Sequence, residues 1–390
     1  MGTETKTYFK ASIQEAKNQL AHSELQQVVP KKHIHKITFV FPDVPHTISG
    51  GLKMVFEYAN RLTMRGYEVR IAFDCHEGIH AKRKYIPLFL KRNFLYPLFI
   101  MYYPTWFKLN QKVKKILLKD GINDKEIPDS DVIIATAVRT AEPVSRLSAA
   151  KGKKLYFIQG FENWTPDWPT ERVENTYRLG MKNIVVAQWL AEKLKNAGAD
   201  CILIPNGIDF NTFNLDIPIR KRRNHVISML YHVAPHKGAK YGIKALQQLK
   251  DIYPDLEAFL FGTTERPAEL PTWIQYTHNA QQVQLRKIYN NSTIYLCPSI
   301  AESFGLTGAE AMACGAAYVS SDYGGVHEYA EDKKNVLLSP PGDVERLVEH
   351  VSYLFEHPEE RIRLAENGNK DVQQLNWERS LDKFEEVLHS

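Results

Sequence analysis

The sequence predicts an α/β protein made of two doubly wound domains, each built on a parallel sheet. The chain has 390 residues, and about 150 residues per domain is the usual expectation. Short apolar runs alternate with segments of helical periodicity, an order that is typical of parallel sheets. The alternation stops at a cluster of turn-forming residues, 205–209, and then begins again. We therefore expect a first domain over residues 36–209 and a second over residues 210–374.

The elements of the first domain follow from their apolar pattern. Residues 36–41 form a short apolar run, which predicts a strand. Residues 51–65 place Val55, Phe56 and Leu62 on one helical face, and Gly66 ends that helix. The same reasoning predicts strands at 68–74, 131–136, 154–159, 184–187 and 201–204, a helix ending at Ala197, and a polar helix at 9–28 inside a leader of residues 1–35.

The second domain repeats the pattern. Strands are expected at 226–231, 256–261, 294–297 and 317–321, and helices at 241–253, 283–290 and 306–314. The last segment, residues 375–390, holds a helix at 377–389, which we expect to pack back on the first domain. Two doubly wound domains that face each other place the ligand crevice at the carboxyl ends of both sheets.

The composition excludes several classes of protein. Hydrophobic residues make up 44% of the chain and charged residues 24%, which is typical of globular proteins. The four cysteines lie far apart, so a disulfide scaffold and a CxxC zinc cluster are excluded. The N-terminus lacks the apolar core of a signal peptide. No uncharged run approaches the ~20 residues that span a membrane, so we expect a cytoplasmic protein.

Common nucleotide and metal motifs are absent or misplaced. The chain has no GxGxxG after a strand and no GxxxxGK[ST], which argues against nicotinamide and P-loop enzymes. Residues 76–80 match HExxH, but they directly follow a predicted strand and include Gly78, so we interpret them as a loop. Asp129 and Asp131 have the DxD spacing of a manganese site, but Asp131 opens a strand and its carboxylate suits a turn. No metal site is predicted.

The segment 299–310 carries the most specific signal. A buried strand is expected to end near Pro298, a loop with Gly305 follows, and a helix begins near Leu306. This arrangement presents backbone N–H groups and a helix N-terminus to an anion. Glu302 and Glu310 would then flank a phosphate cradle. Alternatively, Glu310 only complements the helix N-terminus.

Two further features favour the cradle. Lys237 follows the first strand of the second domain, where it would face the crevice and neutralise a diphosphate, although it would also suit an ordinary solvated site. Gly50 and Gly51 lie between the first strand and its helix, where they allow close backbone approach to a ligand or form a simple tight turn.

Together these residues resemble the family-4 retaining glycosyltransferases, which have the two-domain GT-B fold. The resemblance runs from about Ile37 to the C-terminal helix, and its most specific part is the E-x7-E segment 302–310 with its inner Phe-Gly-Leu. Within the family, the run 156–162 resembles a subgroup that includes bacterial rhamnosyltransferases for cell-surface glycans.

The resemblance implies a role for each matched residue. Glu310 would bind the ribose hydroxyls of the donor nucleotide, and Lys237 would hold the diphosphate together with backbone N–H groups. Glu302 would contact the transferred sugar, so Glu302 and Lys237 are the candidate catalytic residues. Two positions depart from the family: His232 replaces an arginine, and Gln159 replaces a histidine. The other donor-side candidates are Ser303, Phe304, Gly305, Leu306 and Thr307, and the acceptor-side candidates are Gly50, Gly51, Gln159, Glu162 and Arg139.

The resemblance therefore implies a hexosyltransferase that needs neither metal nor cofactor. It would move a sugar, with L-rhamnose as the named candidate, from a nucleoside diphosphate to a growing glycan with retention of configuration. Two other functions stay open. One is a non-catalytic sugar-nucleotide or glycan binder on a degenerate scaffold, and the other is a phosphorylase with a lysine-bound pyridoxal phosphate.

The positive charge of the chain is concentrated in residues 81–120. This segment has a net charge of +9, whereas the other residues have −4, and it also holds nine aromatic residues. Three alternatives account for it. The segment forms helices with inward aromatics and solvated lysines, or it binds an anionic membrane that carries a lipid-linked acceptor, or it binds single-stranded nucleic acid. We expect no nucleic-acid partner, and the membrane alternative would place the protein at the inner face of the cell membrane.

Overall fold

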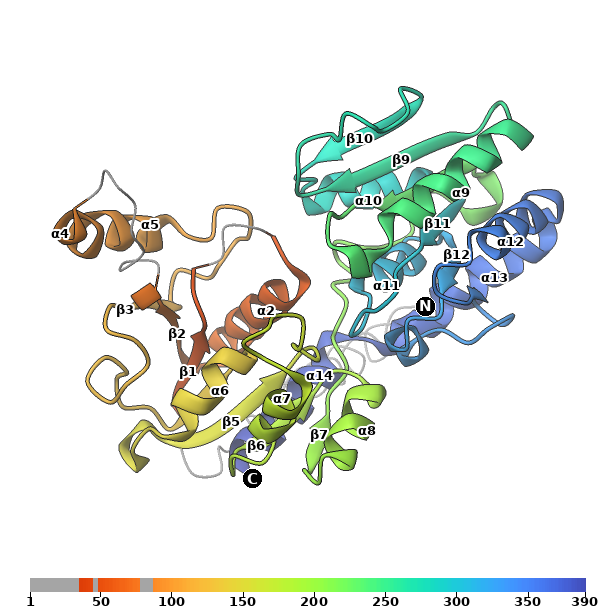
Figure 1. Ribbon diagram of the computed structural model, residues 1–390. Coiled ribbons are helices and arrows are strands. Elements are labelled where there is room, and N and C mark those ends of the chain that lie inside the picture. Colours follow the sequence, from red (N-terminus) through yellow and green to blue (C-terminus); the bar gives the residue numbers. More distant parts are fainter. Residues whose placement is uncertain (1–34, 45–47, 78–86) are drawn as a thin grey trace, which may run out of the picture. The chain divides into compact units, whose positions relative to one another are not determined.

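The computed structural model describes residues 35–44, 48–77 and 87–390. Two parallel sheets organise these residues, each flanked by helices (Figure 1). This arrangement confirms the predicted doubly wound α/β class. The predicted helix at 9–28 lies outside the described residues, and the predicted domain boundaries at 209 and 374 stay predictions.

The N-terminal lobe, residues 35–203, holds a seven-stranded sheet of order β3-β2-β1-β4-β5-β6-β7. All of its strand pairs are parallel. The strands are β1 (Lys36–Phe41), β2 (Glu68–Asp74), β3 (Lys114–Leu118), β4 (Val132–Ala135), β5 (Lys153–Ile158), β6 (Lys182–Val185) and β7 (Cys201–Leu203). The helical elements are α2 (Gly50–Met64), α4 (Leu88–Leu90), η1 (Lys91–Leu95), α5 (Tyr96–Tyr102), α6 (Val138–Ser145), η2 (Ala149–Lys151), α7 (Thr170–Thr176) and α8 (Gln188–Asn196).

The C-terminal lobe, residues 226–371, holds a six-stranded parallel sheet of order β10-β9-β8-β11-β12-β13. The strands are β8 (Val226–Leu230), β9 (Glu257–Gly262), β10 (Ile274–His278), β11 (Ile294–Cys297), β12 (Ala317–Ser321) and β13 (Leu337–Ser339). The helices of this lobe are η4 (Pro235–Lys237), α9 (Ala239–Ile252), α10 (Gln282–Asn291), α11 (Leu306–Ala313), η5 (Gly325–Glu328), α12 (Val344–Glu356) and α13 (Pro358–Asp371), while η3 (Ile219–Lys221), η6 (Val372–Gln374) and α14 (Trp377–His389) flank it in the chain.

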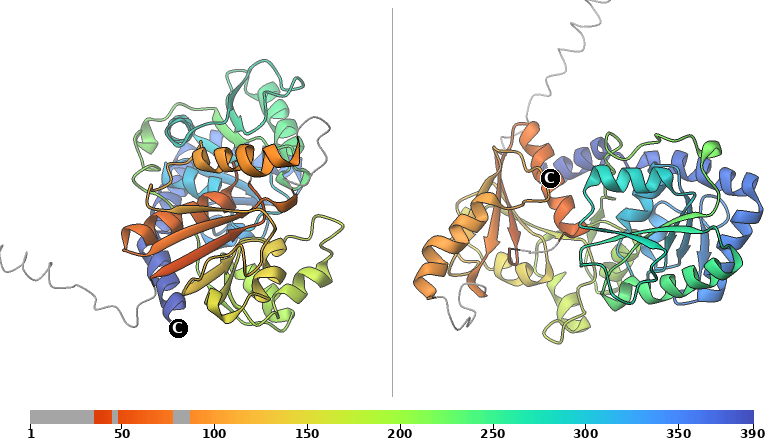
Figure 2. Two further views of the ribbon diagram at one scale, coloured as in Figure 1. Left: turned by 90° about the vertical axis from the view of Figure 1, so that its left-hand side faces the viewer. Right: turned by 90° about the horizontal axis from the view of Figure 1, so that it is seen from above.

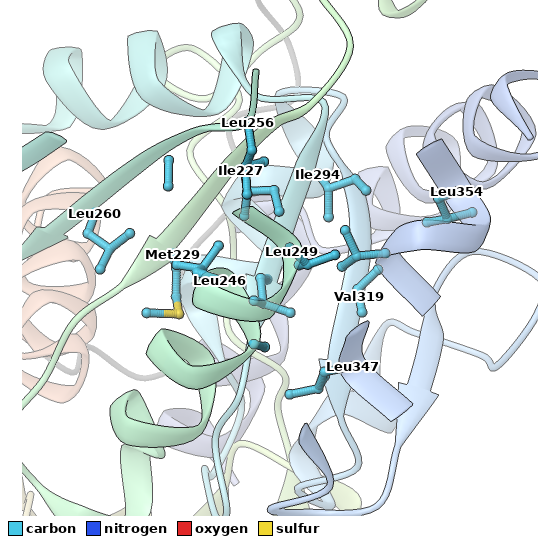
Figure 3. Close-up of a cluster of buried hydrophobic side chains, with 14 of the residues drawn as sticks. Ile227, Met229, Leu246, Leu249, Leu256, Leu260, Ile294, Val319, Leu347 and Leu354 are labelled. Carbon is cyan, nitrogen blue, oxygen red and sulfur yellow. The ribbon is translucent and has the colours of Figure 1, made fainter. Parts of the chain in front are cut away.

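The central strands are buried over almost their whole length, because helices cover both faces of each sheet. Every residue of β11 and β12 is buried. On one face of the C-terminal sheet, Ile227 and Met229 of β8 pack with Leu246 and Leu249 of α9 (Figure 3). This core holds β8 and β11 rigidly, so the loops at their carboxyl ends have a fixed base.

Helix α14 packs against the N-terminal lobe (Figures 1 and 2). The ring of Phe384 lies 4.4 Å from the ring of Tyr58 in α2 and 5.9 Å from that of Phe157 in β5. Arg65, just after α2, pairs with three carboxylates of α14: Glu378, Asp382 and Glu385. The last helix of the chain therefore completes the core of the first lobe.

Residues 87–120, the described part of the positively charged segment 81–120, differ in part from the first alternative, in which aromatic side chains point inward and lysines are solvated. Elements α4, η1 and α5 run on as one helical segment (orange in Figure 2), but its aromatic side chains do not all point inward. The exposed fractions of Phe89, Phe94 and Tyr102 are 65%, 58% and 69%. Lys91 is buried, and Lys115 donates hydrogen bonds to the carbonyls of Met101 and Tyr103. The expectation of inward aromatics and solvated lysines therefore holds only in part, because Tyr103 is buried against Phe56 and Lys108 and Lys112 are exposed.

Candidate functional site

A cavity of about 880 Å³ lies where the carboxyl ends of the two sheets meet. Its walls come from loops that follow β1, β4 and β5 in the N-terminal lobe and β8, β9 and β11 in the C-terminal lobe. Doubly wound sheets bind ligands at this edge. All the predicted site residues except Arg139 line this cavity.

The loop before α11 is shaped by Gly305. This residue has a φ of +80°, and a Cβ atom there would overlap the hydroxyl of Tyr323. Tyr329 Oη donates a hydrogen bond of 2.7 Å to the carbonyl of Gly305, and it also lies 2.8 Å from Tyr323 Oη. The first-turn N–H groups of α11, at Leu306 and Thr307, have no intrahelical partners. A buried pair of tyrosines thus holds the loop so that these N–H groups face the cavity.

Lys237 and Glu302 form an ion pair beside that loop. Lys237 Nζ lies 3.2 Å from Glu302 Oε1, and the Glu302 side chain is almost fully buried. Ser299 Oγ donates a second hydrogen bond, 2.6 Å long, to the same carboxylate oxygen. Gly238 permits this approach, because its φ is +64° and a Cβ atom would overlap the carbonyl of Pro298. One positive and one negative group are therefore fixed next to each other at the cavity wall.

His232 supplies a neutral donor to the same wall. Its Nδ1 accepts a hydrogen bond of 3.0 Å from the Ala234 N–H, which leaves the proton on Nε2 in the neutral ring. Burial lowers the pKa of His232, and the charges of Lys237 and His236 lower it further. At neutral pH His232 thus acts toward an anion as an N–H donor without a positive charge.

The N-terminal lobe contributes its glycines and a glutamine. Ser49 caps α2 by accepting a hydrogen bond from the Leu52 N–H. A Cβ atom on Gly50 would lie 3.0 Å from Leu306 Cδ1, across the cavity in the other lobe. Gln159 follows β5, and its Oε1 is buried with no hydrogen-bond partner among the described residues. Gln159 thus lines the cavity with an amide oxygen that has no protein partner among the described residues.

Glu162 and Arg139 have different environments. Burial raises the pKa of Glu162 to about 7, although its carboxylate accepts a hydrogen bond from the Val138 N–H at the start of α6. Arg139 does not line the cavity, because its guanidinium pairs with Glu77. The structure thus brings Glu162 to the cavity and leaves Arg139 outside it.

Some cavity residues were not found from the sequence. Lys53, in the first turn of α2, reaches Glu310 of α11 at 2.6 Å. Trp189 Nε1 donates a hydrogen bond of 2.8 Å to the carbonyl of Ser303. Trp164 lines the cavity with 66% of its surface exposed. The only available signal was their position shortly after a predicted strand, which many residues share.

The two metal-like motifs have structural roles in the described residues. Asp131 accepts hydrogen bonds of 2.8 Å from the backbone N–H groups of His35 and Lys36, as its place at a strand start predicts. His76 and Glu77 are helical where a loop was expected, and residues 78–80 lie outside the described residues. Within residues 35–44, 48–77 and 87–390, no three His, Cys, Asp or Glu side chains gather as a metal site.

Comparison with known proteins finds a family model that matches the C-terminal lobe. Residues 214–371 match the family model of the glycosyl transferases group 1. The chain is 25% identical over 202 residues to the phosphatidyl-myo-inositol mannosyltransferase of Mycolicibacterium smegmatis, a match that covers 49% of this chain and 51% of that protein. The chain thus spans about half the length of the curated relatives of this kind.

Solved structures resemble the described residues over nearly their whole length. The sucrose-phosphate synthase of Thermosynechococcus elongatus has a TM-score of 0.68 at 17% identity, covering 90% of this chain and 98% of that one. HepE of Anabaena, in complex with UDP-glucose, has a TM-score of 0.68 at 16% identity, covering 91% and 99%. At these identities the likeness concerns the fold, and the expected GT-B architecture is confirmed.

Proposed function

We propose that this chain, whose residues 214–371 form a glycosyl transferases group 1 domain, is a retaining hexosyltransferase that uses a nucleoside-diphosphate sugar. The observation that supports this most is the Lys237–Glu302 pair at 3.2 Å, placed beside the free N–H groups at the start of α11. A diphosphate and the sugar attached to it need a cation, N–H donors and a hydroxyl acceptor at such a spacing.

The chemistry follows from these groups. The bond between the anomeric carbon and the diphosphate oxygen breaks, and the diphosphate leaves with the electron pair. Lys237 and the first-turn N–H groups stabilise the charge that develops, and such preorganised donors are usually the largest catalytic contribution. The neutral His232 adds an N–H donor where the family has an arginine. No step in this scheme requires a metal ion.

Retention of configuration is part of the proposal. The acceptor hydroxyl would attack the oxocarbenium-like carbon from the face that the diphosphate leaves. Its proton would pass to the departing phosphate oxygen, which is the nearest base on that face. Glu302, held by Ser299 and Lys237, would accept hydrogen bonds from sugar hydroxyls.

The sugar and the acceptor are assigned by resemblance. The run 156–162 makes L-rhamnose the first donor sugar to test, and the mannosyltransferase relative makes mannose the second. We propose a cell-surface glycan as the acceptor. The exposed Trp164 in the cavity supports a glycan, because aromatic faces bind the apolar faces of sugar rings.

A lipid-linked acceptor is supported by the surface of residues 88–102. In these residues nine large apolar side chains are exposed, out of 17 such side chains in the described chain. A concentration of exposed apolar side chains of this kind marks an interaction site on a protein surface. Residues 81–120 also carry a net charge of +9. We propose that α4, η1 and α5 rest on an anionic membrane. No described helix has the length and apolarity to cross one.

The function is tested with purified protein and a panel of UDP-, GDP-, dTDP- and ADP-sugars. Release of the nucleoside diphosphate and the anomeric configuration of the product are measured. Lys237→Met and Glu302→Gln should lower turnover by about 10²–10³-fold, whereas Lys240→Met, a change at an exposed lysine of α9, should not. If both site variants keep full turnover, the site assignment is wrong. Nucleotide binding without any turnover would favour the non-catalytic alternative.

The membrane surface is tested separately. Co-sedimentation with vesicles of anionic and of neutral lipid is measured at low and high salt. The double change Phe89→Asn and Phe94→Asn should abolish sedimentation, whereas Met64→Asn, at an exposed residue of α2, should not. A wild-type protein that does not sediment at low salt, or that forms dimers through this surface, contradicts the proposal.

A further inference from the structure

Lys53 and Glu310 join the two lobes across the cavity. Lys53 lies in the first turn of α2, Glu310 lies in α11, and the distance from Nζ to Oε1 is 2.6 Å. The side-chain exposed fractions are 16% for Lys53 and 5% for Glu310. Both residues line the cavity. The contact therefore occupies the carboxylate that, by the family resemblance, would bind the ribose hydroxyls of the donor nucleotide.

The surroundings favour this contact over other partners. The Lys53 ammonium also lies over the ring of Phe213 in a cation–π contact, 4.9 Å from its centroid. The nearest carboxylate on the same helix, Glu57, is held by Arg61 at 3.4 Å. Lys53 is thus directed toward the C-terminal lobe by the ring of Phe213 and the carboxylate of Glu310.

A ribose diol would need the same carboxylate. A carboxylate has two oxygens, and a vicinal diol donates one hydrogen bond to each. Lys53 already donates to Oε1 in a mostly buried place, where a charge-assisted bond is strong. A nucleotide that places one hydroxyl of its diol on Oε1 therefore competes with the ammonium for this mostly buried oxygen.

We propose that Lys53 is an internal stand-in for the ribose. Its ammonium binds Glu310, links the two lobes in the absence of nucleotide, and competes with the donor nucleotide for this carboxylate. The inference rests on the proposed function, because the diol role of Glu310 belongs to it. When the nucleotide binds, the ion pair breaks and the N-terminal lobe loses this link to α11. Donor binding then replaces the hydrogen bond from Lys53 to Glu310 with hydrogen bonds from the ribose, and the same replacement removes the link between the lobes.

The sign of the effect separates this inference from a direct role of Lys53 in binding phosphate. If Lys53 competes, then Lys53→Met should bind nucleoside diphosphates about 3–10-fold more tightly than the wild type, which is the range of one partly exposed ion pair. If Lys53 instead binds the diphosphate, the variant should bind more weakly. Weaker or unchanged binding overturns the inference.

The diol is tested with a matched ligand. Isothermal titration with UDP, GDP, ADP and dTDP identifies the base, and the 2′,3′-dideoxy form of the best binder among UDP, GDP and ADP is then compared, because dTDP is a 2′-deoxynucleotide without this diol. The dideoxy form has no diol to displace Lys53, so the gain from Lys53→Met should disappear. A gain of the same size with the dideoxy nucleotide overturns the exchange.

Two controls keep the measurement specific. Lys195→Met removes an exposed lysine of α8 that does not line the cavity, and should leave affinity unchanged. In a Glu310→Gln background, Lys53→Met should have no effect on affinity, because the acceptor of the ion pair is already gone. Thermal unfolding of each variant confirms that it is folded.

A measurement without nucleotide separates the two proposals. Hydrogen exchange of the α11 amides should be faster in Lys53→Met than in the wild type, because the link between the lobes is lost. Unchanged exchange overturns the contact itself. Faster exchange in a protein that binds none of the four nucleotides overturns both the stand-in role and the proposed function. Nucleotide binding with unchanged affinity in Lys53→Met overturns the stand-in role alone.

Discussion

The hydroxyl of Tyr329 donates a hydrogen bond of 2.7 Å to the carbonyl of Gly305. This bond ties the loop before α11 to the buried residue Tyr329, and Tyr323 completes the network at 2.8 Å. The loop carries the N–H groups that the proposed diphosphate site requires. The shape of the site therefore depends on hydroxyl groups that do not contact the ligand.

Tyr329→Phe should loosen this loop. The change removes one buried hydrogen bond, while the Gly305 carbonyl keeps those from the Gly308 and Ala309 N–H groups, so it should lower the free energy of unfolding by about 0.5–1.5 kcal/mol. Nucleoside-diphosphate affinity should fall as well, because the N–H groups lose their fixed orientation. Denaturant unfolding and titration calorimetry measure the two effects. Tyr353→Phe, at an exposed tyrosine of α12, is the matched control and should change neither. Wild-type affinity in Tyr329→Phe would show that the loop does not need this support.

Gly305→Ala should abolish nucleotide binding. The residue has a φ of +80°, and its Cβ would overlap Tyr323 Oη. Gly66→Ala separates these two causes, because Gly66 has a φ of +96° but no atom within 4 Å of the added Cβ. We expect a backbone cost of about 1 kcal/mol in Gly66→Ala and a larger loss of stability, together with lost binding, in Gly305→Ala. Equal losses of stability in the two variants would contradict the overlap.

Glu162→Gln should change how stability depends on pH. Burial raises the pKa of Glu162 from about 4.5 to about 7 in the folded protein. Between these two values the folded state holds a proton that the unfolded chain has released, so the free energy of unfolding falls as the pH rises. Denaturant unfolding at pH 5 and pH 8 should therefore show a larger fall in the wild type than in the variant, by about 1–3 kcal/mol. The exposed Glu192→Gln is the control, and an equal fall in all three proteins would contradict the assignment.

Trp164→Ala should weaken acceptor binding more than donor binding. The indole lines the cavity, is largely exposed, and stacks on the ring of His236 with 6.4 Å between centroids. Loss of this face should raise the KM for a glycan acceptor about tenfold, at the level of one good aromatic contact, and leave the KM of the donor within about twofold. Trp164→Phe should restore most of the acceptor affinity. Equal changes in both KM values would indicate a structural role.

Most of the fold could be predicted from the sequence because its signals are local. Strands β1, β2, β11 and β12 and helix α14 have the bounds that apolar periodicity predicts. The missed strands β3, β10 and β13 are all edge strands. Edge strands are short or polar, as in the lysine-rich Lys114–Leu118, and so lack the buried pattern.

For the candidate site, the sequence predicted the residues of the C-terminal lobe but not the contacts that they make with the N-terminal lobe. The E-x7-E segment and Lys237 were found because a loop between a buried strand and a helix leaves a short, readable pattern. The residues of the N-terminal lobe that contact them left no such pattern in the sequence. Lys53 looked like part of a solvated helix face, yet it pairs with a carboxylate 257 positions away.

The sequence by itself determined the α/β alternation, the loop with Gly305 before α11 and the concentration of charge in residues 81–120, because each depends on neighbours along the chain. Only the tertiary structure decided that Lys53 meets Glu310, that Arg139 turns to Glu77, and that the apolar residues of 88–102 face outward. The physical reason is the same in all three cases. Periodicity shows which side chains share a face, but only the path of the whole chain decides what that face contacts.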